Sequence, residues 1–136
     1  MSVLLTTPPG MWTPVPYHHV SIGTGSRTVQ IAGQVARDTD GNAVATGDLA
    51  GQVAQVLRNT KIGLEGVGAA FADVTRMRFF VADWQPEKMG DFMAGIESVA
   101  AEIGLPSPLP PTSLIGVQSL YEPDVMVELE TEAVLD

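Results

Sequence analysis

Three glutamates stand at alternate positions near the C-terminus, and their spacing is the first feature that could do chemistry. Glu128, Glu130 and Glu132 lie in the stretch VMVELETEAV, and alternate residues of a β-strand point to the same side of a sheet. Carboxylates about 6.6 Å apart along a strand repel one another, so one could carry a raised pKa unless a cation offsets the repulsion. Two interpretations stay open here: a solvated sheet face, or a carboxylate that acts as a base in a binding site.

Arg76 and Arg78 are the candidates for that cation. In the stretch DVTRMRFFVAD they alternate with the apolar Met77 and Phe79, so both should share the sheet face of the glutamates. Strand arginines that pair with solvent-facing acids are the simpler interpretation. If either arginine binds a ligand, we expect Arg78 to be the anion anchor.

His18 and His19 suggest a metal site, which their spacing opposes. Adjacent strand residues point to opposite faces, and no second histidine stands at a chelating interval. The chain has no cysteine, which excludes a thiolate metal site and a catalytic cysteine. We therefore expect neither a metal nor another cofactor.

The hydrophobic pattern predicts the elements that carry these residues. Asp48 to about Gly66 has helical periodicity with Asp48 as N-cap, and a second helix starts near Pro86 and is stopped by Gly104 and Pro106. Four stretches read as strands: RTVQIAGQV, DVTRMRFFVAD, TSLIGVQSL and DVMVELETEAV. The Asp40–Gly41 turn signal after the first of them indicates a hairpin with a further strand. The order β-β(-β)-α-β-α-β-β predicts a two-layer α+β fold, with a mixed five- to six-stranded sheet and both helices on one face. We expect one domain over residues 1–136.

The last strand should present two unlike faces. Odd-numbered residues should face the helices (Val125, Val127, Leu129, Thr131 and Ala133), and even-numbered residues should face away (Met126, Glu128, Glu130, Glu132 and Val134). The face away from the helices must then meet solvent or a second subunit.

Composition limits the partners. The apolar content of 45% fits a globular chain, and the net charge is −9. A nucleic-acid binder draws its affinity from basic patches, and an anionic membrane surface repels acidic proteins. We expect a small molecule or another protein chain as the partner, and no nucleic acid or membrane. No secretory signal is evident, so a cytoplasmic location is the simplest expectation.

Several stretches, taken in order, resemble the YjgF/RidA family. They are PYHH, IAGQV, DGNAVATGDLAGQVAQVLRNTKIGLEGVG, DVTRMRFFVAD, PPTSLIGV and VELETEAV. The resemblance implies a chorismate-mutase-like α+β fold and a homotrimer with a ligand cleft between neighbouring subunits. Many members hydrolyse enamines or imines to 2-oxo acids and ammonia, and others are binding proteins. Some were labelled endoribonucleases of the L-PSP type, an activity that the acidic charge does not encourage.

The resemblance also implies roles for individual residues. Tyr17 matches the family's tyrosine, Glu128 its water-orienting glutamate, and Gly33 a glycine that lines the pocket wall. Thr112 stands where the family has an arginine that binds the substrate carboxylate, and the other residues expected near the ligand are Ser113, Leu114, Arg78 and His19. Losing a charge-assisted contact of roughly 1.5–3 kcal/mol would weaken carboxylate binding about ten- to hundredfold.

Two functions therefore remain. The first is an enzyme, a hydrolase that deaminates an enamine or imine without the usual arginine. The alternative is a non-catalytic trimer that binds a metabolite for a pathway enzyme.

Overall fold

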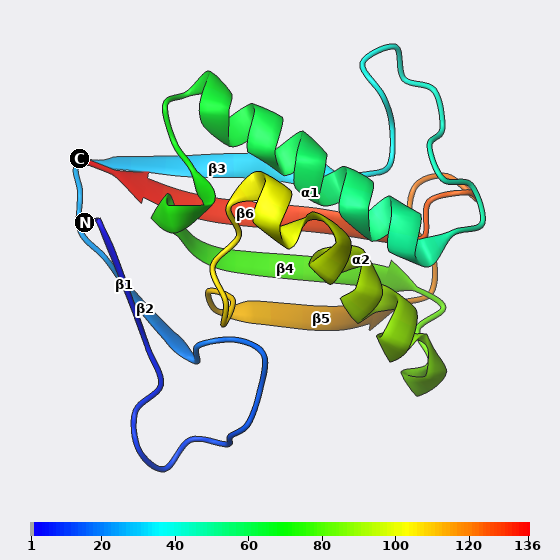
Figure 1. Cartoon of the computed structure of the whole chain (residues 1–136). Coiled ribbons are helices and arrows are strands. Elements are labelled where there is room, and N and C mark those ends of the chain that lie inside the picture. The colour runs from blue at the N-terminus through cyan, green and yellow to red at the C-terminus, as the bar shows by residue number, and fades with distance from the viewer. Residues whose placement is uncertain (1) are drawn as a thin grey trace.

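Two helices cover one face of a four-stranded sheet in the computed structural model, which describes residues 2–136 (Figure 1). The elements in chain order are β1 (Val3–Thr6), β2 (Val20–Gly23), β3 (Arg27–Gln34), α1 (Leu49–Gly66), η1 (Phe71–Asp73), β4 (Val74–Ala82), η2 (Pro86–Lys88), α2 (Met89–Ile103), β5 (Thr112–Val117) and β6 (Val127–Leu135). The predicted α+β fold with both helices on one side is confirmed. We call the opposite side of the sheet the helix-free face.

The strands are divided between two sheets. The main sheet has the order β3-β6-β4-β5, in which only β4 and β5 run parallel. Strands β1 and β2 pair as a separate antiparallel ribbon, whereas the sequence predicted one sheet. The optional extra strand after β3 is only a single bridge between Arg37 and Ala43, which closes the turn at Asp40 and Gly41.

Helix α1 begins where the sequence predicts. The Asp48 carboxylate accepts a hydrogen bond from the Gly51 backbone N–H at 3.0 Å, which satisfies one of the unpaired donors of the first turn. The expected stripe is buried from Leu49 to Leu64. Val67 lies beyond the helix and is 52% exposed.

Helix α2 packs closely across α1 because one position lacks a side chain. A Cβ on Gly95 would lie 2.6 Å from the Ala50 carbonyl oxygen and 2.7 Å from the Val53 Cβ. Pro86 lies in the short helix that precedes α2, and Gly104 ends α2 in the left-handed conformation with φ of 70°, as glycine readily does.

Strand β6 lies at the centre of the molecule and presents the two predicted faces. Its odd-numbered residues and the preceding Val125 are at most 3% exposed, except Leu135 near the strand's end. Val134 departs from the expectation of an open helix-free face, because it is only 7% exposed. A Cβ on Gly23 of β2 would lie 3.0 Å from a Val134 methyl group, so the β1–β2 ribbon covers that end of the face.

Within residues 2–136, no helix is both long and apolar enough to cross a membrane.

Candidate functional site

Glu128 is packed against the backbone of Gly33 on the helix-free face. A Cβ built on Gly33 would lie 1.9 Å from Glu128 Oε2 and 2.6 Å from its Cδ, so any side chain at position 33 would force the carboxylate to move. Gly33 belongs to the end of β3, where the register with β6 is irregular. The absence of a side chain at position 33 therefore creates the space that the carboxylate occupies.

The surroundings of Glu128 favour its protonated form. Burial is the main cause that raises the pKa of this carboxyl, and the charge of Glu130 adds to it. A carboxylate with a raised pKa holds a proton more strongly than an ordinary glutamate, as a general base must. Perturbed groups of this kind are concentrated at functional sites, although structural clusters also produce them.

Unlike Glu128, Glu132 is paired with an arginine that lies on the same helix-free face. Arg78 Nη1 donates to Glu132 Oε2 at 2.9 Å, and Gln30 donates to the other oxygen at 3.3 Å. The two charged side chains are each about one-third exposed, so the pair contributes only about 0–1 kcal/mol. Arg78 was the expected anion anchor, and in this chain its guanidinium binds a glutamate.

Arg76 contacts Ser113, one of the residues expected near the ligand. Its Nη2 lies 2.5 Å from Ser113 Oγ. Ser113 is in register with Arg78 of β4, so its side chain points to the helix-free face together with both arginines.

Tyr17 and Thr112 line a different cavity, at the other side of the sheet. This cavity has a volume of about 410 Å³ and lies between α2, the segment before β2, and the start of β5. Leu114 also lines it, as does Ser113 of the edge strand β5, although the Ser113 side chain points to the helix-free face. The apolar wall is formed by α2 and the N-terminal segment. The Thr112 hydroxyl donates to the Pro110 carbonyl at 2.7 Å.

The strand register separates Thr112 from Glu128. Thr112 is level with Met77 of β4, whose fully buried side chain faces the helices. Glu128 is level with Phe80, which has the opposite parity on β4. The two expected site residues therefore point to opposite faces of the sheet within one chain.

His19 contacts the N-terminal segment. Its Nε2 lies 2.8 Å from the Trp12 carbonyl oxygen, and its ring meets the Tyr17 ring edge-on at a centroid distance of 5.2 Å. In this position His19 supports the segment that carries the tyrosine. No cluster of three potential metal ligands occurs among residues 2–136.

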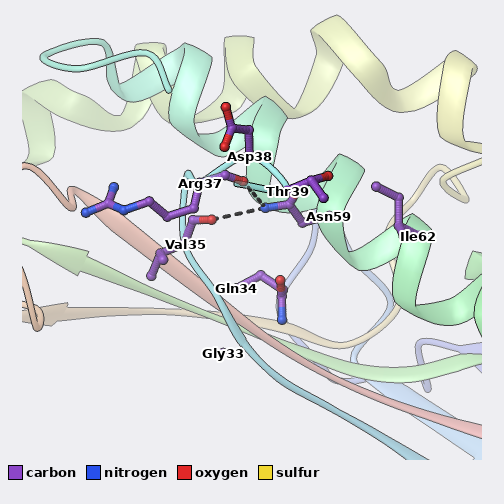
Figure 2. Close-up of a pocket in the computed structure, with 8 residues that line it drawn as sticks. All are labelled: Gly33, Gln34, Val35, Arg37, Asp38, Thr39, Asn59 and Ile62. Carbon is purple, nitrogen blue, oxygen red and sulfur yellow. Dashed lines mark hydrogen bonds between the residues drawn. The ribbon is translucent and has the colours of Figure 1, made fainter. Parts of the chain in front are cut away.

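A second cavity, of about 290 Å³, lies beside Gly33 (Figure 2). Gly33 and the loop after β3 form one wall, and Asn59 and Ile62 of α1 form the other. The Asn59 amide donates to the carbonyls of Val35 and Arg37 at 3.1 Å each. These bonds tie the loop that follows Gly33 to helix α1.

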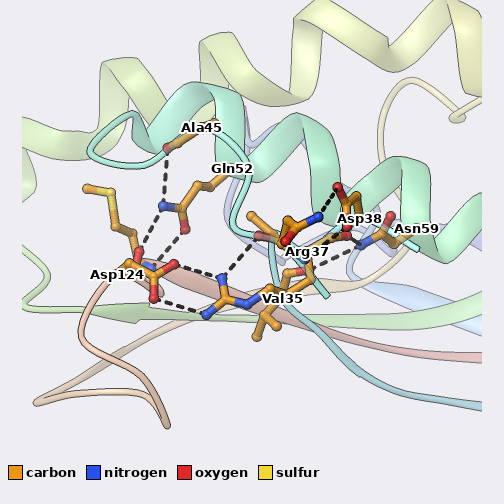
Figure 3. A network of polar contacts seen from close by, with 10 residues as sticks. Val35, Arg37, Asp38, Ala45, Gln52, Asn59 and Asp124 are labelled. Atoms are coloured by element: carbon orange, nitrogen blue, oxygen red, sulfur yellow. Dashed lines mark hydrogen bonds and ion pairs between the residues drawn. The ribbon is translucent and has the colours of Figure 1, made fainter. Parts of the chain in front are cut away.

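A polar network fixes the loop after Gly33 and the segment before Glu128 (Figure 3). The Gln52 amide is 1% exposed, donates to the Asp124 carbonyl at 2.9 Å and accepts from the Met126 N–H at 2.9 Å. Arg37 donates two hydrogen bonds to the Asp124 carboxylate, at 2.7 and 3.0 Å, and lowers the pKa of that group. The network joins the loop after β3 to the start of β6.

Sequence reasoning missed this network. Its one visible signal was Gln52, a polar residue next to Val53 at the start of a helix whose periodic positions are mostly apolar. A buried amide must find hydrogen-bond partners, but the sequence does not reveal which ones.

The fold and these residues define a class of protein: a small α+β chain whose candidate binding groups are divided between the two sides of one sheet. Residues 12–135 match the family described as Endoribonuclease L-PSP. A 2-iminobutanoate/2-iminopropanoate deaminase from Dermatophagoides farinae is 30% identical over 109 residues, which cover 80% of this chain and 79% of that protein.

Two solved structures are also similar to this chain. A Rid-family protein of unknown function, YyfB from Yersinia pestis, is 35% identical with a TM-score of 0.87, covering 99% of this chain and 100% of that one. The YjgF gene product of E. coli, at 23% identity and a TM-score of 0.69, shares the fold over 97% of this chain and 94% of its own. The chain belongs to the YjgF/RidA family, as the sequence motifs predicted.

Proposed function

We propose that this protein forms a homotrimer whose inter-subunit clefts hydrolyse an enamine or imine to a carbonyl product and ammonia. Membership of a family that includes an imine deaminase supports the reaction class. The observation that carries the proposal is the half-buried Glu128 carboxylate, which is packed on Gly33 and has a raised pKa.

Imine hydrolysis needs one base and one water. The water oxygen bonds to the imine carbon while Glu128 takes a proton from the water, and Glu128 then delivers that proton to the nitrogen, which gives a carbinolamine. The carbinolamine then loses ammonia, as its hydroxyl proton passes to the departing nitrogen and the C=O bond forms. An enamine first gains a proton at carbon and loses one from nitrogen, and so becomes the imine. The Tyr17 hydroxyl would donate a hydrogen bond to the substrate.

The opposite orientation of Thr112 and Glu128 supports a site shared between copies. One chain offers the Tyr17 and Thr112 cavity on the helix side, and Glu128 on the helix-free face. A head-to-tail contact between copies brings two different surfaces together and closes as a ring. Three copies could thereby join each cavity to the next chain's Glu128.

Thr112 argues against substrates that carry a carboxylate, which an arginine at this position would bind. Its hydroxyl proton is used by the Pro110 carbonyl, so its oxygen can only accept a hydrogen bond, whereas an arginine would donate two to a carboxylate. We therefore expect weak turnover of imines that carry a carboxylate. This same observation favours the alternative, a trimer that binds a metabolite without converting it.

The test measures ammonia release from enamines and imines generated in situ, with and without a carboxylate. Glu128→Gln should abolish turnover, because an amide cannot take the proton from water. Glu132→Gln is the control on the same face and should retain turnover. Ligand binding without ammonia release from any of these substrates would favour the metabolite-binding alternative. Equal turnover by wild type and Glu128→Gln would exclude Glu128 as the base.

We propose no nucleic-acid partner. The net charge of −9 per chain repels phosphate, and assembly multiplies it. Salt-sensitive micromolar RNA binding by the purified protein would contradict this expectation.

A further inference from the structure

The cavity beside Tyr17 continues along helix α2 into a second hollow. The neighbouring cavity has a volume of about 200 Å³ and shares four lining residues with the first: Pro16, Met93, Ile96 and Leu109. The backbone holds this common wall, because Leu109 N–H donates to the Pro16 carbonyl at 2.9 Å and His18 N–H donates to the Leu109 carbonyl at 2.7 Å. We call the two cavities together the α2 groove.

One stripe of α2 runs the length of the groove. Met89 lines only the first cavity, Met93 and Ile96 line both, and Ala100 lines only the second. Residues three or four apart lie on one side of a helix, and 11 residues of helix span about 16 Å. The α2 groove is therefore long and mostly apolar, and its two cavities, of about 410 and 200 Å³, offer more room than a small imino acid needs.

The polar groups of the groove suit an uncharged ligand. Among the described residues, none of the side chains that line the first cavity is charged, and Glu97 is the only charged one in the second. Arg76 and Arg78 point to the helix-free face. In the proposed assembly that face of a neighbouring copy meets the cavity, where it adds the negative Glu128 and where Arg78 is already paired with Glu132. An ionised carboxylate would lose its hydration here without gaining a cation. Thr112 Oγ1 offers an acceptor for a ligand N–H, and the Tyr17 hydroxyl can donate.

We propose that the α2 groove binds a neutral ligand with an amide- or imine-like head at Tyr17 and Thr112 and an extended apolar chain along Met93, Ile96 and Ala100. The inference rests on the proposed function, because it assigns the substrate class of the same cleft. The natural substrate is then an uncharged imine or enamine with a long apolar substituent, and not a small 2-imino acid.

Two series of probes test the ligand class on the full-length protein. The dissociation constants of primary alkanamides, from acetamide to heptanamide, are measured by calorimetry beside those of alkanoates of equal length. Each buried methylene should strengthen amide binding about fourfold. Each amide should bind about tenfold or more tightly than the matching alkanoate, because the groove does not neutralise a carboxylate. Alkanoates that bind as tightly as the amides would overturn the proposal.

A matched pair of variants tests the path along α2. Ala100→Phe should fill the second cavity, so that affinity stops rising at a shorter chain length. Ala101→Phe places the same ring on an exposed position of the same helix and should leave the series unchanged. If Ala100→Phe does not fold, the wild-type series decides: an absent chain-length dependence, as when a second copy covers the groove, overturns the proposal.

Ammonia release separates this inference from the proposed function. Amide binding as expected, with no turnover of any imine or enamine, would leave the ligand class standing and remove the hydrolase. Turnover of carboxylate-bearing imines, with no amide binding, would remove the ligand class and leave the hydrolase standing.

Discussion

Replacing Gly33 by alanine adds one methyl group at the point where Glu128 is packed. The new Cβ would lie 1.9 Å from Glu128 Oε2, and real Cβ atoms essentially never approach another heavy atom within 3.0 Å. The carboxylate must therefore move by at least about 1 Å, a displacement that can lower a reaction rate about 100-fold. We expect kcat to fall by about that factor.

The fold should tolerate the same change. Alanine is more favourable than glycine in a strand by about 0.5–1 kcal/mol, and the atom to be displaced is the far end of a flexible side chain. We expect a small change in the melting temperature. The pKa of Glu128 should also fall towards its usual value, because the methyl group pushes the carboxylate towards solvent and relieves the burial that raises it.

The assay combines ammonia release, thermal unfolding and an NMR titration of the Glu128 carboxyl. Gly90→Ala is the control, because a Cβ there meets nothing within 4 Å, and it should resemble wild type in all three measurements. A Gly33→Ala protein with wild-type turnover and an unchanged Glu128 titration would refute the packing argument.

Three further predictions concern charge and the polar network. Glu130→Gln removes a charge that raises the pKa of Glu128. The acidic limb of the pH–rate profile should therefore move to lower pH, and an unmoved limb would show that Glu130 does not act on the base. Wild type should show little deamination of 2-aminoacrylate generated in situ and Thr112→Arg a partial gain, whereas wild-type turnover equal to that of arginine-bearing relatives would place the anchor elsewhere. Gln52→Leu leaves the Met126 N–H without its partner, which should cost about 1–3 kcal/mol of unfolding free energy in denaturant titrations. Gln55→Leu is the matched change on the same helix, at a half-buried residue whose amide donates to Asn59, and it should cost less.

The elements could be predicted from sequence because their causes are local. The N-cap at Asp48, the left-handed stop at Gly104 and the alternation of β6 each depend on residues only a few positions apart. The same alternation correctly placed Glu128 and Thr131 on opposite faces of β6.

The site depended on contacts between distant residues, which local patterns do not encode. Arg37 and Asp124 are 87 positions apart, and periodicity shows nothing of their pairing. The pairing of Arg78 with a glutamate of the same face was a stated alternative, yet the register of β4 and β6 sets Arg78 level with Glu130, and its guanidinium reaches Glu132 instead. Gly33 was assigned through family resemblance alone, and its physical reason, the space for the Glu128 carboxylate, appears only in three dimensions.

The most direct test of a shared cleft uses the absence of cysteine in this chain. Thr112→Cys and Glu128→Cys are prepared separately, mixed through unfolding and refolding, and treated with a short bismaleimide. The two positions face opposite sides of the sheet in one chain, so they can meet only between copies. We predict a covalent dimer in the mixture and none in either variant alone. A mixture that stays monomeric on a denaturing gel, with native light scattering at the monomer mass, would contradict the inter-subunit site.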